Sequence, residues 1–421
     1  MRHFRNRAVI IAAAAACLAA VFSGCTLLTD IPVTPSPADL TAAWKTPVPT
    51  SSPTVGVRPT PGNFTCPTGE LQPILPENTA DIIEIARIRP DALIEAALSP
   101  NGSLLAILTE QQALLYSLDC SQEALQIAIE DFGSLTGHAL ADESLALSFE
   151  EQGVQLWTLP EGEEGSALPA EARQLAFSPD GSLLATVGSD NALELWQVDT
   201  GERLHRVVLR RPAAGLGFSP DGDTLAVELE GDLDDPVELW DVSSGELLQT
   251  FSWSERAGPI YFVRFAPDWG TLAWVSRATV LIMDAESGLE QAVLGHEDYV
   301  DALAYSPDGT LAAITSAAEV AGELLSVVVL WDVDAARQTA LLFHAEPITA
   351  LAFSPDGRML ATATLDGRIG LWEIVEAERV VRLGDQVDLI RSLSFALDGR
   401  LLISVSIGDR VQFWGLEAAA P

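Results

Sequence analysis

Apolar, strand-like runs alternate with short polar turns along this chain, with a period of about forty residues between Leu98 and Trp414. Each unit contains a strand of alternating small and large residues, a Ser-Pro-Asp-Gly turn, a Leu-Ala strand and a strand ending in Leu-Trp. Residues 175–196 and 351–372 are two clear copies. In the turn, Pro presets φ and Gly adopts the positive φ that closes a hairpin. Such a period, with four strands per unit, is typical of propeller blades.

The spacing of the turns gives the number of blades. Turn positions fall at Pro100, Leu140, Pro179, Pro220, Pro267, Pro307, Pro355 and Leu397. Eight units predict an all-β, eight-bladed β-propeller. A seven-bladed ring is the alternative, because the second unit lacks the Ser-Pro-Asp-Gly turn and the first has Tyr116 in place of the Trp.

These repeats resemble the WD-repeat family over about residues 81–416, a likeness strengthened by Leu294-Gly-His296 and by Trp-Asp at 240–241 and 331–332. The resemblance implies a structural hydrogen-bond tetrad of His, Ser or Thr, Asp and Trp in each blade. Only the seventh unit matches at every position, with His344, Thr362, Asp366 and Trp372. We therefore expect apolar packing between blades to hold the ring more than the tetrads do.

The resemblance also predicts how the ring closes. The chain ends soon after the third strand of the last unit, residues 411–416, and a spare strand at 81–88 precedes the first unit. In the WD-repeat family such an N-terminal strand becomes the outer strand of the last blade. This pairing would remove an exposed edge that invites aggregation.

The N-terminal residues form a separate region. Arg2, Arg5 and Arg7 precede an apolar run from Ala8 to Phe22, which is short for a membrane span and is followed by Ser23-Gly24-Cys25. This start resembles a bacterial lipoprotein signal, although Phe22 stands where that family prefers Leu. The resemblance implies cleavage after Gly24 and lipid on Cys25, so residues 1–24 are the expected signal peptide. An ordinary signal with a chance cysteine is the alternative.

Residues 25–76 are rich in Pro, Thr and Ser, and we expect them to form an extended tether between the membrane and a propeller at 77–417. The propeller would then lie outside the cytoplasm, anchored to the membrane by the lipid on Cys25. Cys66 and Cys120 are the other cysteines left after cleavage. An even pair in an exported protein favours a disulfide, with two unpaired thiols as the alternative.

Charge excludes one class of partner. Removing residues 1–24 takes away three Arg and no carboxylate, so the formal net charge moves from −37 to −40. A chain this acidic repels phosphate backbones, and nucleic acid is excluded as a partner. The acidic stretch 228–235 is read as a solvated loop, with a cation site as the alternative, because it lacks the EF-hand spacing.

No Walker loop, dinucleotide-binding loop, nucleophile elbow or Cys/His metal cluster occurs in the sequence. We therefore predict no catalytic residues, no cofactor and no metal. The WD-repeat resemblance implies a non-catalytic scaffold that binds a protein or peptide. The alternatives are an enzyme or small-ligand binder with a site at the mouth of the central channel, and an accessory or sensor module in envelope assembly.

Overall fold

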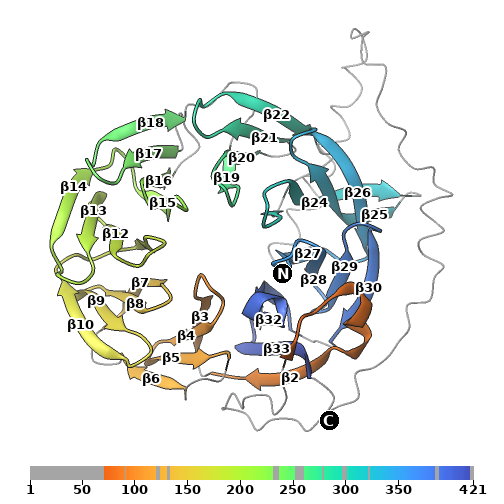
Figure 1. The fold of residues 1–421 in the computed structure, drawn as a ribbon, viewed down its shortest axis with the longest axis horizontal. Helices are drawn as coiled ribbons and strands as arrows, with labels where there is room; N and C mark the ends of the chain where they lie inside the picture. The colour runs from red at the N-terminus through yellow and green to blue at the C-terminus, as the bar shows by residue number, and fades with distance from the viewer. Residues whose placement is uncertain are drawn as a thin grey trace, which may run out of the picture. The chain divides into compact units, whose positions relative to one another are not determined.

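The computed structural model describes residues 71–417, except 91, 120–123, 130–132, 231–236, 252–259, 277–278, 296–299, 301, 321–322 and 385–387. Eight antiparallel sheets stand in a ring, with the first strand of each toward the centre and the fourth outside (Figure 1). The prediction of an eight-bladed β-propeller is confirmed. The units at 93–128 and 135–168, whose sequence signals are the weakest, each form a complete blade.

The strands of the first four blades follow the chain in order. Blade 1 contains β3 (Leu93–Leu98), β4 (Leu104–Thr109), β5 (Gln112–Ser117) and β6 (Leu125–Ala128). Blade 2 contains β7 (Leu135–Leu140), β8 (Ser144–Phe149), β9 (Gly153–Thr158) and β10 (Glu163–Leu168). Blade 3 contains β11 (Gln174–Phe177), β12 (Leu183–Val187), β13 (Ala192–Gln197) and β14 (Arg203–Val208). Blade 4 contains β15 (Ala213–Phe218), β16 (Thr224–Leu229), β17 (Val237–Asp241) and β18 (Leu247–Phe251).

The next three blades repeat this order. Blade 5 contains β19 (Ile260–Phe265), β20 (Thr271–Ser276), β21 (Thr279–Asp284) and β22 (Glu290–Gly295). Blade 6 contains β23 (Leu303–Tyr305), β24 (Leu311–Val320), β25 (Glu323–Asp332) and β26 (Arg337–His344). Blade 7 contains β27 (Ile348–Phe353), β28 (Met359–Thr364), β29 (Ile369–Glu373) and β30 (Glu378–Leu383).

Blade 8 is built from both ends of the propeller. Its first three strands are β31 (Ile390–Ala396), β32 (Leu401–Ser406) and β33 (Arg410–Glu417), with the 3-10 turn η3 (Leu397–Gly399) between β31 and β32. The outer edge of β33 pairs antiparallel with β2 (Ile83–Ile88) and with β1 (Leu71–Gln72). The predicted closure by an N-terminal strand is therefore confirmed, and the strand begins at Ile83 because η1 (Pro76–Asp81) precedes it.

The expected tether extends to residue 76, whereas the structure places the last residues of that range on the propeller. Leu71 and Gln72 pair with Glu417 and Leu416, and Ile74 is only 2% exposed. The cause is apolar burial, since Ile74 packs between blades 7 and 8. In the part of the chain that the structure describes, no helix is both long and apolar enough to cross a membrane.

The core is a ring of eight apolar layers, one between each pair of neighbouring blades. Because side chains alternate across a strand, Leu105 packs toward blade 8 while Ala106, the next residue on β4, packs toward blade 2. Both faces of each blade are therefore buried, which explains the nearly continuous apolar strands in the sequence.

The turns between first and second strands lock neighbouring blades together near the axis. A Cβ at Gly222 would lie 3.7 Å from Pro179 Cδ in the preceding turn, and one at Gly399 would lie 3.4 Å from Pro355 Cδ. Between blades 8 and 1, the backbone N–H of Leu397 donates to the carbonyl of Gly102 at 3.2 Å. The Pro and Gly of the repeated turn thus contact each other across blades as well as shaping their own hairpins.

Candidate functional site

Three of the four predicted tetrad residues are joined where the outer strand of blade 6 meets blade 7. The indole N–H of Trp372 donates to the Thr362 hydroxyl at 3.0 Å, and this hydroxyl lies 2.9 Å from His344 Nε2. The other ring nitrogen, Nδ1, lies 3.0 Å from the carbonyl oxygen of Leu342. These distances describe one chain of bonds in which Nδ1–H donates to the carbonyl and Nε2 accepts from the hydroxyl.

Burial, together with the nearby charge of Arg379, lowers the pKa of His344 to about 4. The imidazole is therefore neutral near pH 7, as the hydrogen-bond chain requires. His344 is 6% exposed and Thr362 is fully buried, so no ligand can reach this group. It ties the outer strand of blade 6 to blade 7 and has a structural role.

Asp366, the fourth predicted member, lies apart from the histidine. Its carboxylate accepts from the Thr364 hydroxyl at 2.7 Å, pairs with Arg368 and lies 3.6 Å from Arg382. These groups satisfy the Asp366 carboxylate, and the carbonyl of Leu342 satisfies His344, so the two side chains have separate partners. The structure thus contains a triad in place of the full tetrad.

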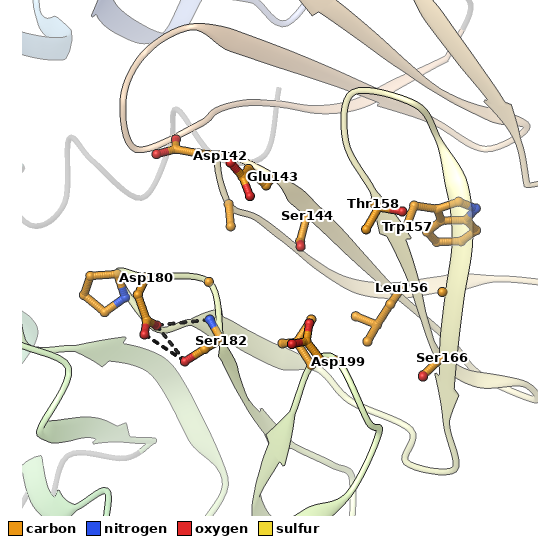
Figure 2. A pocket seen from close by; sticks show the side chains of 15 residues that line it. Asp142, Glu143, Ser144, Leu156, Trp157, Thr158, Ser166, Asp180, Ser182 and Asp199 are labelled. Atoms are coloured by element: carbon orange, nitrogen blue, oxygen red, sulfur yellow. Dashed lines mark hydrogen bonds between the residues drawn. The ribbon is translucent and has the colours of Figure 1, made fainter.

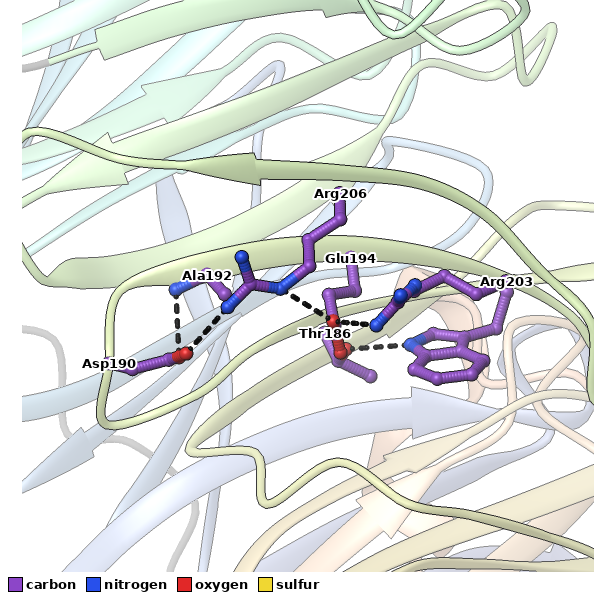
Figure 3. Close-up of polar contacts among 7 residues, drawn as sticks. Thr186, Asp190, Ala192, Glu194, Arg203 and Arg206 are labelled. Atoms are coloured by element: carbon purple, nitrogen blue, oxygen red, sulfur yellow. Dashed lines mark hydrogen bonds and ion pairs between the residues drawn. The ribbon is translucent and has the colours of Figure 1, made fainter.

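Blade 3 has a Thr–Trp hydrogen bond without a histidine, and arginines from its outer strand form ion pairs beside it (Figure 3). Trp196 donates to the Thr186 hydroxyl at 3.1 Å. Arg206 contacts Asp190 at 2.9 Å and Glu194 at 3.1 Å, and Glu194 is 8% exposed. These ion pairs form between neighbouring strands. The sequence signal for them is the position of two Arg on the fourth strand, opposite the third.

The repeated Ser-Pro-Asp-Gly turn holds its carboxylate outward. In blade 3 the Ser178 hydroxyl donates to Asp180 at 2.6 Å, and Ser178 Oγ accepts from the backbone N–H of Leu183 at 2.9 Å. The Ser178 hydroxyl, helped by the backbone N–H and hydroxyl of Ser182, lowers the pKa of Asp180. The turn therefore presents an ionised aspartate at the surface.

These turns place carboxylates around one end of the ring, here called the acidic face. It is formed by the turns that join first to second strands and third to fourth strands in each blade. Every blade contributes a carboxylate to these turns, from Asp119, Asp142, Asp180, Asp221, Asp268, Asp308, Asp356 and Asp398. Among the described residues of these turns, only Arg358 and Arg400 are basic. The opposite end carries both signs, including Arg173, Arg210 and Asp190.

A groove of about 700 Å³ opens between blades 2 and 3 and is lined by turns of the acidic face (Figure 2). Its apolar lining includes Leu156, Trp157 and Val198. Its carboxylates are Asp142, Glu143, Asp180 and Asp199, and no Lys, Arg or His is among the described residues that line it. Such a groove favours a ligand with an apolar group and a positive charge.

The groove is open because blade 2 has a short turn. Three residues, 141–143, join β7 to β8, whereas five residues, 354–358, join the equivalent strands of blade 7. The Pro that packs against the next blade's Gly is absent, and Ala141 takes its place beside Gly181. The sequence contained this signal as the degenerate turn near Leu140.

The remaining predicted sites lie wholly or partly outside the described residues. Cys25, Cys66 and Cys120 all do, so lipidation and the disulfide stay predictions. In the acidic stretch 228–235, residues 231–235 also do, while Glu228 lies on β16, where burial raises its pKa. Within the described part of the chain, no group of three His, Cys, Asp or Glu is placed to hold a metal ion.

Comparison with known families gives two matches. The family "WD domain, G-beta repeat" matches residues 288–332 and 337–373, and "Anaphase-promoting complex subunit 4 WD40 domain" matches residues 135–214. Each match to the first family begins at or near the outer strand of one blade and ends with the third strand of the next. Because each repeat ends with the third strand of a blade, the last blade lacks an outer strand. The N-terminal closing strand supplies it.

Several relatives share parts of the propeller. An uncharacterized WD repeat-containing protein of Synechocystis is 36% identical over 22% of this chain and 26% of its own length. Human pre-mRNA-processing factor 17 is 29% identical over 19% of this chain and 14% of its own length. Protein HIR1 of Cryptococcus neoformans is 28% identical over 33% and 17%, respectively. The chain thus aligns with about a quarter or less of each relative.

The computationally designed Ika8 protein has a similar solved structure, with a TM-score of 0.60 and 18% identity over 77% of this chain and 96% of its own. At this identity the likeness concerns the fold alone.

Proposed function

We propose that this WD-repeat β-propeller is a non-catalytic protein-binding scaffold, held outside the cytoplasm by lipid on Cys25, and that it meets its partner with the acidic face. The observation that carries the proposal is the uneven charge of the two ends of the ring. Carboxylates from all eight blades gather at one end, where the described turns hold only two basic residues. A continuous surface of one sign attracts a partner of the opposite sign and steers its approach.

The family matches support a protein-binding scaffold and do not identify its partner. The family matches lie on WD repeats, whose usual role is to offer loops to other proteins. The hydrogen-bond chains of blades 3 and 7 join neighbouring strands and serve to hold the propeller together. This arrangement favours the scaffold over an enzyme at the channel mouth.

Partner capture tests the proposal. The full chain is expressed in a bacterial host, crosslinked on intact cells and purified, and the co-purified proteins are quantified by mass spectrometry. A face variant removes four exposed carboxylates from blades 4 to 6: Asp223→Asn, Glu246→Gln, Glu286→Gln and Asp334→Asn. A matched control removes four from the opposite end: Glu110→Gln, Glu150→Gln, Glu151→Gln and Glu346→Gln.

We expect specific partners with the unaltered chain and the control, and at least a fivefold loss with the face variant. Equal capture by both variants would overturn the assignment to the acidic face. The absence of any reproducible partner would overturn the scaffold itself.

A further inference from the structure

The chain itself fills one groove between blades. Residues 73–82 leave β1, cross the gap between blades 7 and 8, and return as β2. The backbone N–H of Ile74 donates to the carbonyl of Gly399 at 2.9 Å. Ile74 and Ile82 are 2% and 3% exposed and belong to the apolar layer between these two blades.

A charge pair orients this segment. Arg358, in the turn of blade 7, lies 3.4 Å from Glu77, three residues after the buried Ile74. Asn78 shapes the turn between them, since its carboxamide oxygen accepts from the N–H of Leu75 at 2.9 Å. The segment thus inserts the branched side chain of Ile74 between the blades and places the charge of Glu77 against the turn of blade 7.

The open groove between blades 2 and 3 is the equivalent place three blades farther around the ring. Leu145 pairs with Trp157 as Leu360 pairs with Trp372, so Glu143 in blade 2 takes the position of Arg358 in blade 7. By the same register, Gly181 in blade 3 takes the position of Gly399. The groove between blades 2 and 3 therefore offers an equivalent backbone carbonyl and an apolar lining. Its charge is reversed, because a Glu stands where blade 7 has an Arg.

We infer that the groove between blades 2 and 3 binds an extended segment of a partner protein that carries an apolar residue and, three positions later, a Lys or Arg. The inference rests on the proposed scaffold function and names its binding site. The volume of about 700 Å³ admits such a segment, and the four lining carboxylates select its charge. A second copy of this chain is disfavoured as the occupant by the net charge of −37.

A designed peptide tests the inference. The probe is a fluorescein-labelled peptide of residues 71–82 with Glu77→Lys, and its binding to the purified full-length protein is followed by fluorescence anisotropy. The unaltered 71–82 peptide is the charge control. We expect the Lys peptide to bind about tenfold more tightly than the Glu peptide.

Protein variants locate the binding. Glu143→Arg should weaken the Lys peptide about tenfold and strengthen the Glu peptide, and Glu143→Gln should fall between. Glu150→Arg, an equal change at the opposite end of blade 2, should leave both within twofold. Thermal melts establish that each variant is folded.

Equal affinities across the variants, or no binding of the Lys peptide, would overturn the inference. Since the partner-capture variants leave the groove intact, that result would not touch the scaffold proposal.

Discussion

Buried hydroxyls in blade 7 differ sharply in what they do. Thr362 links an indole and an imidazole, whereas Thr349 Oγ1 is buried without a hydrogen-bond partner among the described residues. Removing a hydroxyl that satisfies buried groups leaves those groups unpaired, while removing an unpaired one relieves a penalty. The two threonines therefore form a matched pair for experiment.

Thr362→Val should lower the free energy of unfolding by roughly 2–3 kcal/mol, because Trp372 and His344 both lose their partner. Thr349→Val should be neutral or stabilising. Urea unfolding followed by tryptophan fluorescence measures both. Similar losses for the two variants would show that the triad contributes nothing beyond side-chain shape.

His344 should make stability depend on pH. Its pKa falls from about 6.5 in the unfolded chain to about 4 in the fold, because burial disfavours the charged form. The stabilisation is therefore complete above pH 6.5 and is lost as pH falls toward 4. Between pH 7 and 5 the loss is on the order of 2 kcal/mol.

His344→Gln isolates this effect, because it removes the imidazole and leaves every carboxylate of the protein in place. The variant should show a smaller fall in unfolding free energy than the unaltered chain between pH 7 and 5. Parallel pH profiles would contradict the assignment.

At the scale of elements, the closing strand is the vulnerable part of the ring. β2 covers the edge of β33, and a bare edge strand is a template for aggregation. A truncation that starts at Arg89 should elute from size-exclusion chromatography as aggregate and lose its cooperative melt. A truncation that starts at Leu71 keeps β1, η1 and β2 and should remain monomeric. A cooperative melt of the shorter form would show that β2 is dispensable.

The sequence predicted a strand or turn wherever its signal lies within a single repeat. Spacing of turns fixed the blade count even for blade 2, and the spare apolar strand predicted closure. The groove-filling segment 73–82 was hidden, because Ile74 and Ile82 stand among prolines and polar residues and their burial depends on two blades distant in sequence. The same holds for Arg206 and Asp190, whose pairing requires the register of two strands.

At the scale of the whole molecule, the proposed lipid anchor on Cys25 would keep the acidic face near the membrane, where it would meet its proposed partner. Cys25→Ser should abolish incorporation of radioactive palmitate and release the propeller from the membrane fraction, because no other thiol stands at the end of the signal. Cys17→Ser is the matched control and should retain both. Labelling that persists in Cys25→Ser would refute the lipoprotein proposal.

The pairing of Ile83 with Gly415 also imposes an order on folding. Each blade packs on the one before it, so the middle of the ring can form as the chain is synthesised. The last blade cannot, because its outer strand is made first and its third strand almost last. Such distant contacts are slow to form. Until these contacts form, β2 has no partner. A chain that ends before residue 411 would therefore leave β2 exposed to proteases.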